Sequence, residues 1–424
     1  MNPIKEIIAK LKSNKEFSRN FVWRCVQTFG KQGASFVIFI IATYVLSKEN
    51  MGIYNYVFSA LYLLTIFADF GISTATSKYV AEYNVTDKTK LKRVLFNTTS
   101  IVFVISIVVT ILAVTFGPLW FGEYNKYLLY ILPLVFLAPL TSLYDGIYRG
   151  LKRFKELAII SLIAGGISLI IAYFGTKTLG LTGALLTQDA MYLIYAIILA
   201  IRYWEWEPKF DKKMIVDIGR YSLVFGIATL GYYLFSKVNI LIMGQYGMLK
   251  EIATYELLNK AFTLYLLPFT ILGQVLAPYI TEAFTLKKYL NVTNIYLKSL
   301  LYLGLLSVVF VPITYFGTKL AISVLMPQYN TELLALILLP VTITYAKNVF
   351  GAPINSGIIV STGHAGIMTV INIIAGGVNV LLSIWAIKAY GFMGVIWVTL
   401  FVQLFFTVVL NILYFDKLSK YGEA

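Results

Sequence analysis

Apolar stretches of about 20 residues, each long enough for a helix to cross the hydrocarbon core of a bilayer, alternate with short polar breaks along nearly the whole chain. The pattern predicts about twelve transmembrane helices, which makes the fold class all-α. The predicted spans are residues 22–46, 52–74, 94–116, 127–148, 157–175, 180–203, 218–243, 253–284, 295–316, 331–358, 365–388 and 391–414.

The composition supports this interpretation. Hydrophobic residues make up 59% of the 424, charged residues only 13%, and the mean hydropathy is +0.78. A soluble globular chain is less apolar and about twice as charged. We therefore expect an integral membrane protein, and the predicted spans leave no soluble domain of any size.

Short motifs recur between the two halves of the chain. Ile-Ala-Gly-Gly occurs at residues 163–166 and again at 374–377, 211 positions later. The glycines of Gly-Leu-Thr-Gly-Ala at 180–184 return with the same offset in Gly-Phe-Met-Gly-Val at 391–395. Earlier in each half, Tyr54 and Tyr255 open equivalent spans 201 positions apart, so the later part of the second half contains an insertion of about ten residues. Motifs that recur at such offsets indicate a duplicated bundle, and internal repeats of membrane helices are typical of transporters.

The duplication predicts two lobes of six helices each. We assign residues 1–203 to the first lobe, 204–217 to a linker that acts as a hinge, and 218–424 to the second lobe. An even number of spans per lobe makes the repeat parallel and pseudo-symmetric about an axis along the membrane normal. Two such lobes enclose a central cleft, which is expected to open alternately to each side.

Basic residues concentrate on one side of the predicted membrane. Clusters precede the first span and follow the second, fourth, sixth, eighth and twelfth spans, whereas the opposite loops carry single lysines. By the positive-inside rule, both termini are cytoplasmic, and the protein is a multi-pass protein of the cell membrane. The net charge of +15 then reflects contact with anionic membrane lipids, and no nucleic-acid partner is expected. The cluster residues are Lys5, Lys10, Lys12, Lys15, Arg19, Lys88, Lys90, Lys92, Arg93, Arg149, Lys152, Arg153, Lys155, Lys209, Lys212, Lys213, Lys287, Lys288, Lys417 and Lys420.

The first span carries three polar residues on one helical face. Arg24, Gln27 and Lys31 are spaced i, i+3 and i+7, so they point in the same direction. An ionisable side chain at membrane depth costs several kcal/mol unless it meets a cavity or a partner. This face is therefore expected to line the cleft rather than contact lipid.

Other ionisable residues lie within predicted spans of both halves. Glu256 with Lys260, and Asp145 with Arg149, are spaced i, i+4 and either neutralise each other or face the cleft. The remaining cations either line the cleft or pair across helices with Asp69 or Asp189. We predict substrate binding by Arg24, Lys31, Lys237, Lys260 and Lys347, and coupling or polar cleft contacts by Asp69, Asp189, Gln27, Asn239 and Glu256.

A cleft lined by unpaired cations favours an anionic ligand. Arginine binds phosphate oxygens in a fork and lysine acts as a point charge, so a phosphate or diphosphate group fits this lining. No metal site is expected, because Cys25 and His364 are the only cysteine and histidine. No Gly-rich phosphate loop with Lys-Ser/Thr occurs either, so ATP bound to this chain does not drive transport. No cofactor is predicted, and H⁺ or Na⁺ is the candidate coupling ion.

Several motifs together resemble a family of membrane transporters. They are Met51-Gly52-Ile53-Tyr54, Asp69-Phe70-Gly71-Ile72, Ser77-Lys78-Tyr79-Val80-Ala81 and the 180–184 segment with its second copy. The chain resembles polysaccharide flippases of the multidrug/oligosaccharidyl-lipid/polysaccharide exporter superfamily. The resemblance implies two six-helix lobes around a cavity that includes Arg24 and Lys31, and transfer of a polyprenyl- or dolichyl-(di)phosphate-linked oligosaccharide between leaflets.

Two alternatives belong to other functional classes. A cation-coupled multidrug or small-molecule antiporter of the same superfamily would need an acidic cavity, whereas this one is predominantly basic. A glycan polymerase or glycosyltransferase would need acid/base residues on sizeable loops, and the predicted outer loops are short. We therefore predict a transporter and no enzyme, whose partners are a lipid-linked oligosaccharide, membrane lipids and glycan-assembly enzymes.

Overall fold

A computed structural model describes residues 15–203 and 206–422 of the chain, and no β-strand occurs within these ranges. The first fourteen residues of the predicted first lobe, the first two of the predicted linker and the last two of the predicted second lobe lie outside them. The helices of the first half are α2 (Lys15–Val45), α3 (Lys48–Asp69), α4 (Ile72–Thr86), α5 (Lys88–Phe121), η1 (Gly122–Tyr124), α6 (Asn125–Tyr130), α7 (Leu134–Gly150) and α8 (Phe154–Arg202). Those of the second half are α9 (Lys212–Ser236), α10 (Asn239–Gln245), α11 (Leu249–Tyr265), α12 (Leu267–Thr285), α13 (Tyr289–Leu325), η2 (Pro327–Tyr329), α14 (Glu332–Ala346), α15 (Asn348–Ile354), η3 (Asn355–Ile359) and α16 (Ala365–Gly422).

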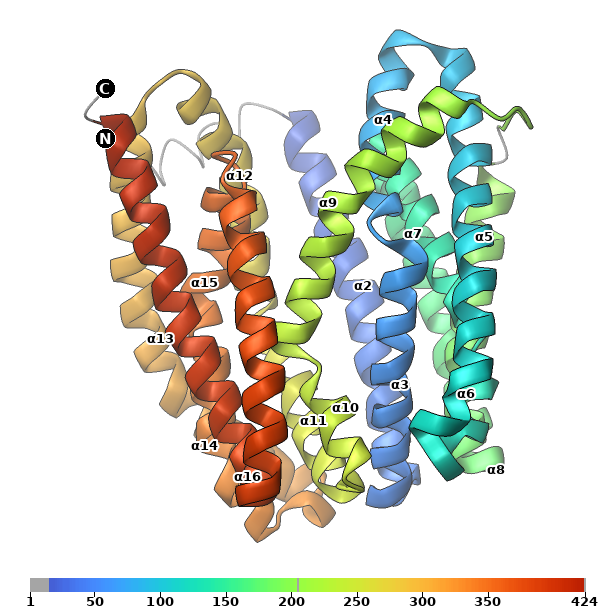
Figure 1. The fold of residues 1–424 in the computed structure, drawn as a ribbon, viewed down its shortest axis with the longest axis vertical. Helices are drawn as coiled ribbons and strands as arrows, with labels where there is room; N and C mark the ends of the chain where they lie inside the picture. The colour runs from blue at the N-terminus through green and yellow to red at the C-terminus, as the bar shows by residue number, and fades with distance from the viewer. Residues whose placement is uncertain (1–14, 204–205, 423–424) are drawn as a thin grey trace. The chain divides into compact units, whose positions relative to one another are not determined.

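The fold is all-helical (Figure 1), and its long apolar helices make it a multi-span membrane protein. Among the described residues, eight helices are long and apolar enough to cross a membrane, or nine if the bent pair α11–α12 counts as one span. Two of the predicted spans are joined within α8 and two within α16, and the span predicted at 127–148 consists of the shorter helices α6 and α7. The count of about twelve stays a prediction.

Glycine produces the sharp breaks inside α8 and α16. Gly180 (φ 57°, ψ −131°) and Gly391 (φ 61°, ψ −146°) adopt a backbone conformation that a side chain disfavours. Three residues further on, a Cβ added to Gly183 would clash with the carbonyl oxygen of Gly175. The two recurring glycines therefore form a tight, non-helical turn between two helical segments, which explains why both are repeated 211 positions later.

The described residues form two compact units, and the chain passes from one to the other inside α9. The first unit ends at Leu230 and the second begins at Gly231. The predicted second lobe begins at residue 218. In the structure, residues 218–230 pack with the first unit instead. The division into two six-helix lobes around a linker stays a prediction.

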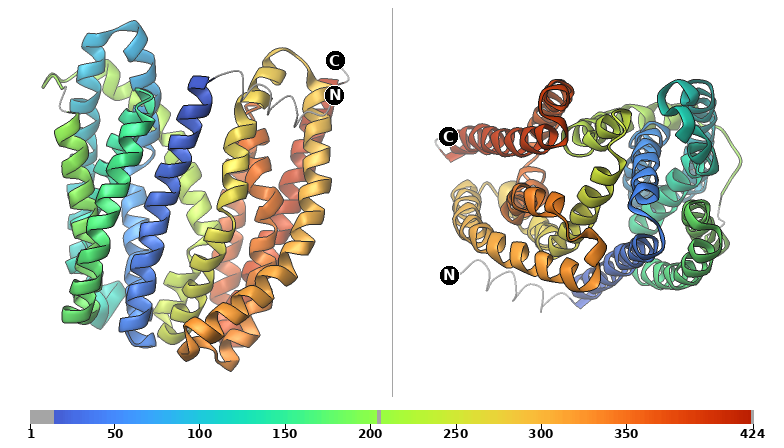
Figure 2. Two further views of the ribbon diagram at one scale, coloured as in Figure 1. Left: turned by 180° about the vertical axis from the view of Figure 1, so that it is seen from behind. Right: turned by 90° about the horizontal axis from the view of Figure 1, so that it is seen from below.

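Small residues make equivalent contacts in the two units. In the first unit α2 packs against α8 (Figure 2), and a Cβ on Gly30 would lie 2.8 Å from the side chain of Leu162. In the second unit a Cβ on Gly231 would lie 2.9 Å from Ile373. Gly231 lies 201 positions after Gly30, and Ile373 lies 211 positions after Leu162. These are the two offsets of the sequence repeat. This close packing of small residues is typical of membrane helices and supports the duplication.

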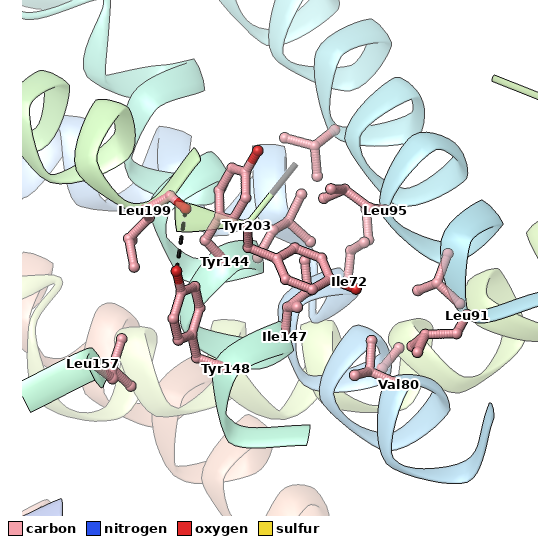
Figure 3. Packing of buried hydrophobic residues seen from close by; sticks show 14 of the residues in the cluster. Ile72, Val80, Leu91, Leu95, Tyr144, Ile147, Tyr148, Leu157, Leu199 and Tyr203 are labelled. Carbon is pink, nitrogen blue, oxygen red and sulfur yellow. Dashed lines mark hydrogen bonds between the residues drawn. The ribbon is translucent and has the colours of Figure 1, made fainter. Parts of the chain in front are cut away.

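A hydrophobic core of the first unit lies among α4, α5, α7, α8 and the start of α9 (Figure 3). Ile72, Leu95, Ile147 and Leu157 are each at most 3% exposed and pack in this cluster. The hydroxyl of the buried Tyr148 donates to the carbonyl oxygen of Leu199 at 3.3 Å, so a polar group is satisfied within the apolar core. This core fixes the position of α7 relative to α8.

The linker residues after 205 contact the N-terminal part of α5. Arg93 donates to both carboxylate oxygens of Glu207 at 3.1 and 3.2 Å. The Asn97 amide donates to the carbonyl oxygen of Lys209 and accepts from the backbone N–H of Asp211, each at 3.0 Å. The ring of Phe96 packs between those of Trp206 and Phe210. These contacts hold the described part of the linker on the first unit.

Candidate functional site: a cationic pocket in the first unit

One face of α2 lines a polar pocket with a volume of about 350 Å³. Arg24, Gln27 and Lys31 all contribute to it, as their spacing predicted. The remaining lining comes from the same face of α2, from α7 and from the second part of α8. These residues are Thr28, Gln32, Ser35, Asp145, Gln188, Met191 and Tyr192.

Asp145 of α7 organises the cationic end of this pocket. Its Oδ2 lies 3.0 Å from Nε of Arg149, which confirms the predicted i, i+4 pair. The same oxygen lies 3.8 Å from Nη1 of Arg24, and the Gln27 amide donates to Oδ1 at 3.1 Å. Arg24 in turn donates to the side-chain oxygen of Gln27. The acid paired with Arg24 is therefore Asp145, not Asp69 or Asp189 as the cross-helix alternative expected.

Lys31 lies deeper along the same helical face. Its ammonium is 5.1 Å from the ring centroid of Tyr195, a cation–π contact that partly compensates for burial. The Tyr195 hydroxyl shares a hydrogen bond of 3.1 Å with Ser161. Lys31 also borders a narrow apolar crevice between α2 and α8, which includes Ala34 and Gly165. The pocket therefore combines a charged end with an apolar neighbour.

The two aspartates predicted to couple transport occupy different surroundings. Asp69 ends α3 and accepts hydrogen bonds from the backbone N–H and hydroxyl of Ser73 at 3.0 and 2.8 Å. It thereby satisfies a backbone N–H in the first turn of α4, whose N-cap residue is Gly71. Asp189 is half-buried in α8, and its Oδ1 has no hydrogen-bond partner in the described part of the chain. A buried unsatisfied oxygen is costly, so Asp189 is the better candidate for binding a proton or an ion.

The other predicted site residues lie in the second unit. Lys237 follows the end of α9 and interacts electrostatically with Glu256, as does Lys260. Glu256, which is 7% exposed, also accepts a hydrogen bond from Asn259, and the Tyr345 hydroxyl donates to Asn259 at 2.9 Å.

Lys347 occupies the break between α14 and α15. It donates to Asn348 at 2.9 Å and lies 5.8 Å from the ring of Phe235. The structure thus groups Arg24, Gln27 and Lys31 in one pocket of the first unit and places the remaining predicted cations in the second.

Asn239 belongs to a buried network that joins α10 to α16. It donates to the hydroxyl of Thr399, and its oxygen accepts from Asn379 at 3.1 Å and from Ser383 at 3.2 Å. Asn379 also donates to the carbonyl oxygen of Leu234, one of those left unpaired where α9 ends. This network compensates for the broken helix, which gives Asn239 a structural role.

Sequence reasoning missed part of the pocket. Thr28 and Ser35 continue the i, i+4 spacing of Arg24 and Lys31, and that signal was available. Gln188 comes from α8 and donates to the buried Tyr54 hydroxyl at 3.1 Å. Nothing in the spacing along the chain brings α2, α7 and α8 together.

Comparisons with known proteins agree with these observations. A family model described as polysaccharide biosynthesis protein matches residues 17–284. An uncharacterized membrane protein of Methanocaldococcus jannaschii is 27% identical over 51% of this chain and 56% of its own length. The sporulation protein YkvU of Bacillus subtilis is 23% identical over 64% of this chain and 67% of its own.

Solved structures share the fold at low identity. An inward-facing multidrug resistance transporter of the MATE family gives a TM-score of 0.76 at 13% identity, covering 94% of this chain and 99% of that one. The lipid II flippase MurJ in an inward closed conformation gives 0.70 at 15%, covering 94% and 90%. A transporter of Pyrococcus furiosus, described as having a binding pocket of reverse polarity, gives 0.67 at 14% and covers 97% of both chains.

Proposed function

Because the chain belongs to the polysaccharide biosynthesis protein family, a family of membrane transporters rather than enzymes, we propose that it flips a lipid-linked oligosaccharide. The substrate is an oligosaccharide on a polyprenyl or dolichyl (di)phosphate. The protein moves it from the cytoplasmic to the outer leaflet by alternating access, for surface polysaccharide or glycoprotein glycan assembly.

The pocket formed by Arg24, Gln27 and Lys31 carries this proposal. Its volume of about 350 Å³ lies within the range of small-molecule sites, and two cations line it. The residues 201 positions after Arg24 and Lys31 are Phe225 and Tyr232, so the repeated bundle does not need a cation at either position to pack. The cost of burying these charges is therefore best explained by an anionic ligand.

The antiporter alternative finds less support in this pocket. A cationic drug needs a free carboxylate, but Asp145 is occupied by Arg149, Gln27 and Arg24. The pocket is thus predominantly basic, which does not suit a cationic drug.

Localisation, coupling and partners follow from the same proposal. Both termini are cytoplasmic, as the distribution of lysine and arginine predicts. A proton or Na⁺ bound at Asp189 drives the cycle, because that side chain has a buried oxygen without a hydrogen-bond partner in the described part of the chain. Glycan-assembly enzymes on the cytoplasmic side supply the substrate.

Translocation in proteoliposomes tests the proposal. The probe is a fluorescent polyprenyl-diphosphate oligosaccharide, followed with and without a pH or Na⁺ gradient. Lys31→Ala is expected to abolish translocation. Lys126→Ala is the matched control, because Lys126 also makes a cation–π contact, at 5.0 Å from the ring of Tyr127, but lies outside the pocket.

The outcomes separate the two functions. A flippase with a cationic pocket is supported if the wild type and Lys126→Ala both translocate the probe and Lys31→Ala does not. Folded wild-type protein that translocates no lipid-linked sugar would refute the proposal, and export of cationic dyes by the same vesicles would favour the antiporter.

A further inference from the structure

Asp145 is shared unequally between two arginines. Arg149 approaches Oδ2 to 3.0 Å, whereas Arg24 stays 3.8 Å away. The Gln27 side chain stands between Asp145 and Arg24, since it donates to the carboxylate and accepts from the guanidinium. Arg149 is therefore the stronger partner of this carboxylate.

The two arginines also differ in their relation to the pocket. Arg24 and Asp145 line it, but Arg149 does not. Arg149 lies one helical turn after Asp145 in the last turn of α7, and its side chain is 35% exposed against 13% for Asp145. The negative charge of Asp145 is thus balanced from outside the pocket.

This arrangement determines the charge available to a ligand. Arg24, Lys31 and Arg149 contribute three positive charges and Asp145 one negative charge, which leaves a net charge of +2. Without Arg149 the carboxylate would neutralise Arg24, and Lys31 alone would remain. Charges a few ångströms apart in a partly buried site interact strongly, so the loss of one cation matters.

We propose that Arg149 is a positioning residue that keeps Arg24 available and makes the pocket selective for a ligand with two negative charges. Such a ligand is a diphosphate diester, in which a diphosphate joins the carrier lipid to the sugar. A phosphate diester carries one charge and is the weaker ligand. The inference rests on the proposed function and narrows its substrate class.

Binding of two short-chain probes to the full-length protein in detergent tests the inference. The probes are citronellyl-diphospho-N-acetylglucosamine and citronellyl-phospho-N-acetylglucosamine, which differ by one phosphate and one charge, and calorimetry gives each Kd. The wild type is expected to prefer the diphosphate. Arg149→Gln weakens diphosphate binding about 10-fold, the effect of one nearby charge in a partly buried site.

The double variant Asp145→Asn/Arg149→Gln provides the decisive readout. It removes one charge of each sign, so the charge argument predicts affinity close to that of the wild type. A merely structural role for Arg149 predicts no such recovery. Arg93→Gln is the matched control, because it breaks an ion pair of 3.1 Å in the same unit, away from the pocket, and should leave both affinities unchanged.

Each result has a distinct meaning. Equal affinity of wild type and Arg149→Gln, a double variant as weak as Arg149→Gln, or equal binding of both probes would overturn the inference. If Arg149→Gln does not fold, Asp145→Asn alone still tests it, because tighter diphosphate binding than in the wild type is expected. A wild type that binds neither probe would instead refute the proposed function.

Discussion

Replacing Gly71 by alanine is expected to destabilise the first unit strongly. Gly71 follows Phe70 at the break between α3 and α4, with φ at +83°, the left-handed region. An added Cβ would lie 2.5 Å from the carbonyl oxygen of Ser222 and 2.9 Å from the backbone nitrogen of Gly226. Both are backbone atoms of α9, which cannot rotate away as a flexible side chain can.

Two separate costs add at this position. The left-handed backbone costs an L residue about 1–2 kcal/mol. Overpacking against fixed atoms costs about 1–3 kcal/mol more. We expect Gly71→Ala to lower the free energy of unfolding by about 2–5 kcal/mol in total.

Gly247→Ala isolates the first cost. Gly247 has a similar φ of +71°, but a Cβ there would meet nothing within 4 Å. Its alanine variant should lose only about 1–2 kcal/mol. Denaturant unfolding in detergent micelles, followed by tryptophan fluorescence, measures both free energies.

A third variant separates the two causes further. Asparagine tolerates the left-handed region but keeps the Cβ, so Gly71→Asn should remain more destabilising than Gly247→Asn. If Gly71→Ala costs no more than Gly247→Ala, the close approach of α9 to the break does not exist and the packing argument is wrong.

Three further predictions concern other parts of the molecule. Burial lowers the pKa of His364 below its ordinary 6.5, so the unfolded chain binds a proton more readily than the folded one. The free energy of unfolding should therefore fall as the pH drops below about 6.5. Melting temperatures measured as the pH is lowered through this value should show that fall in the wild type and lose it in His364→Phe. Asn379→Leu should cost about 2–4 kcal/mol in unfolding free energy, since Asn239 and a backbone carbonyl lose buried hydrogen-bond donors. Asp69→Asn should keep the response of transport to an ion gradient, because Asp69 bonds to Ser73 and asparagine retains an acceptor oxygen. Loss of that response in the proteoliposome assay would instead assign Asp69 to ion coupling.

Spacing along a single helix predicted part of the pocket. Because side chains three, four and seven residues apart share one face, Arg24, Gln27 and Lys31 could be placed together without any structure. The same rule gave the pair of Asp145 with Arg149. It gave no information on α7 relative to α2, so the link from Asp145 to Gln27 and Arg24 was not anticipated.

The motif Asp69-Phe70-Gly71 also shows what the sequence could suggest and what only the structure could decide. Its presence in the sequence suggested a role, and we considered Asp69 for ion coupling. In the structure Asp69 accepts hydrogen bonds from Ser73 in the first turn of α4, and Gly71 permits close contact with α9. A helix break in a membrane leaves backbone groups unpaired, and which side chain satisfies them depends on the local geometry.

Length, hydrophobicity and repetition by themselves determined that this chain forms membrane helices, because an apolar stretch of about 20 residues satisfies its backbone in lipid only as a helix. The motifs that recur at a fixed offset likewise indicated a duplicated bundle. Only the tertiary structure decided how charges are shared, since Arg24, Asp145 and Arg149 interact through packing between helices far apart in sequence. The energy of an ion pair depends on distances of a few ångströms, and no pattern along the chain fixes those distances.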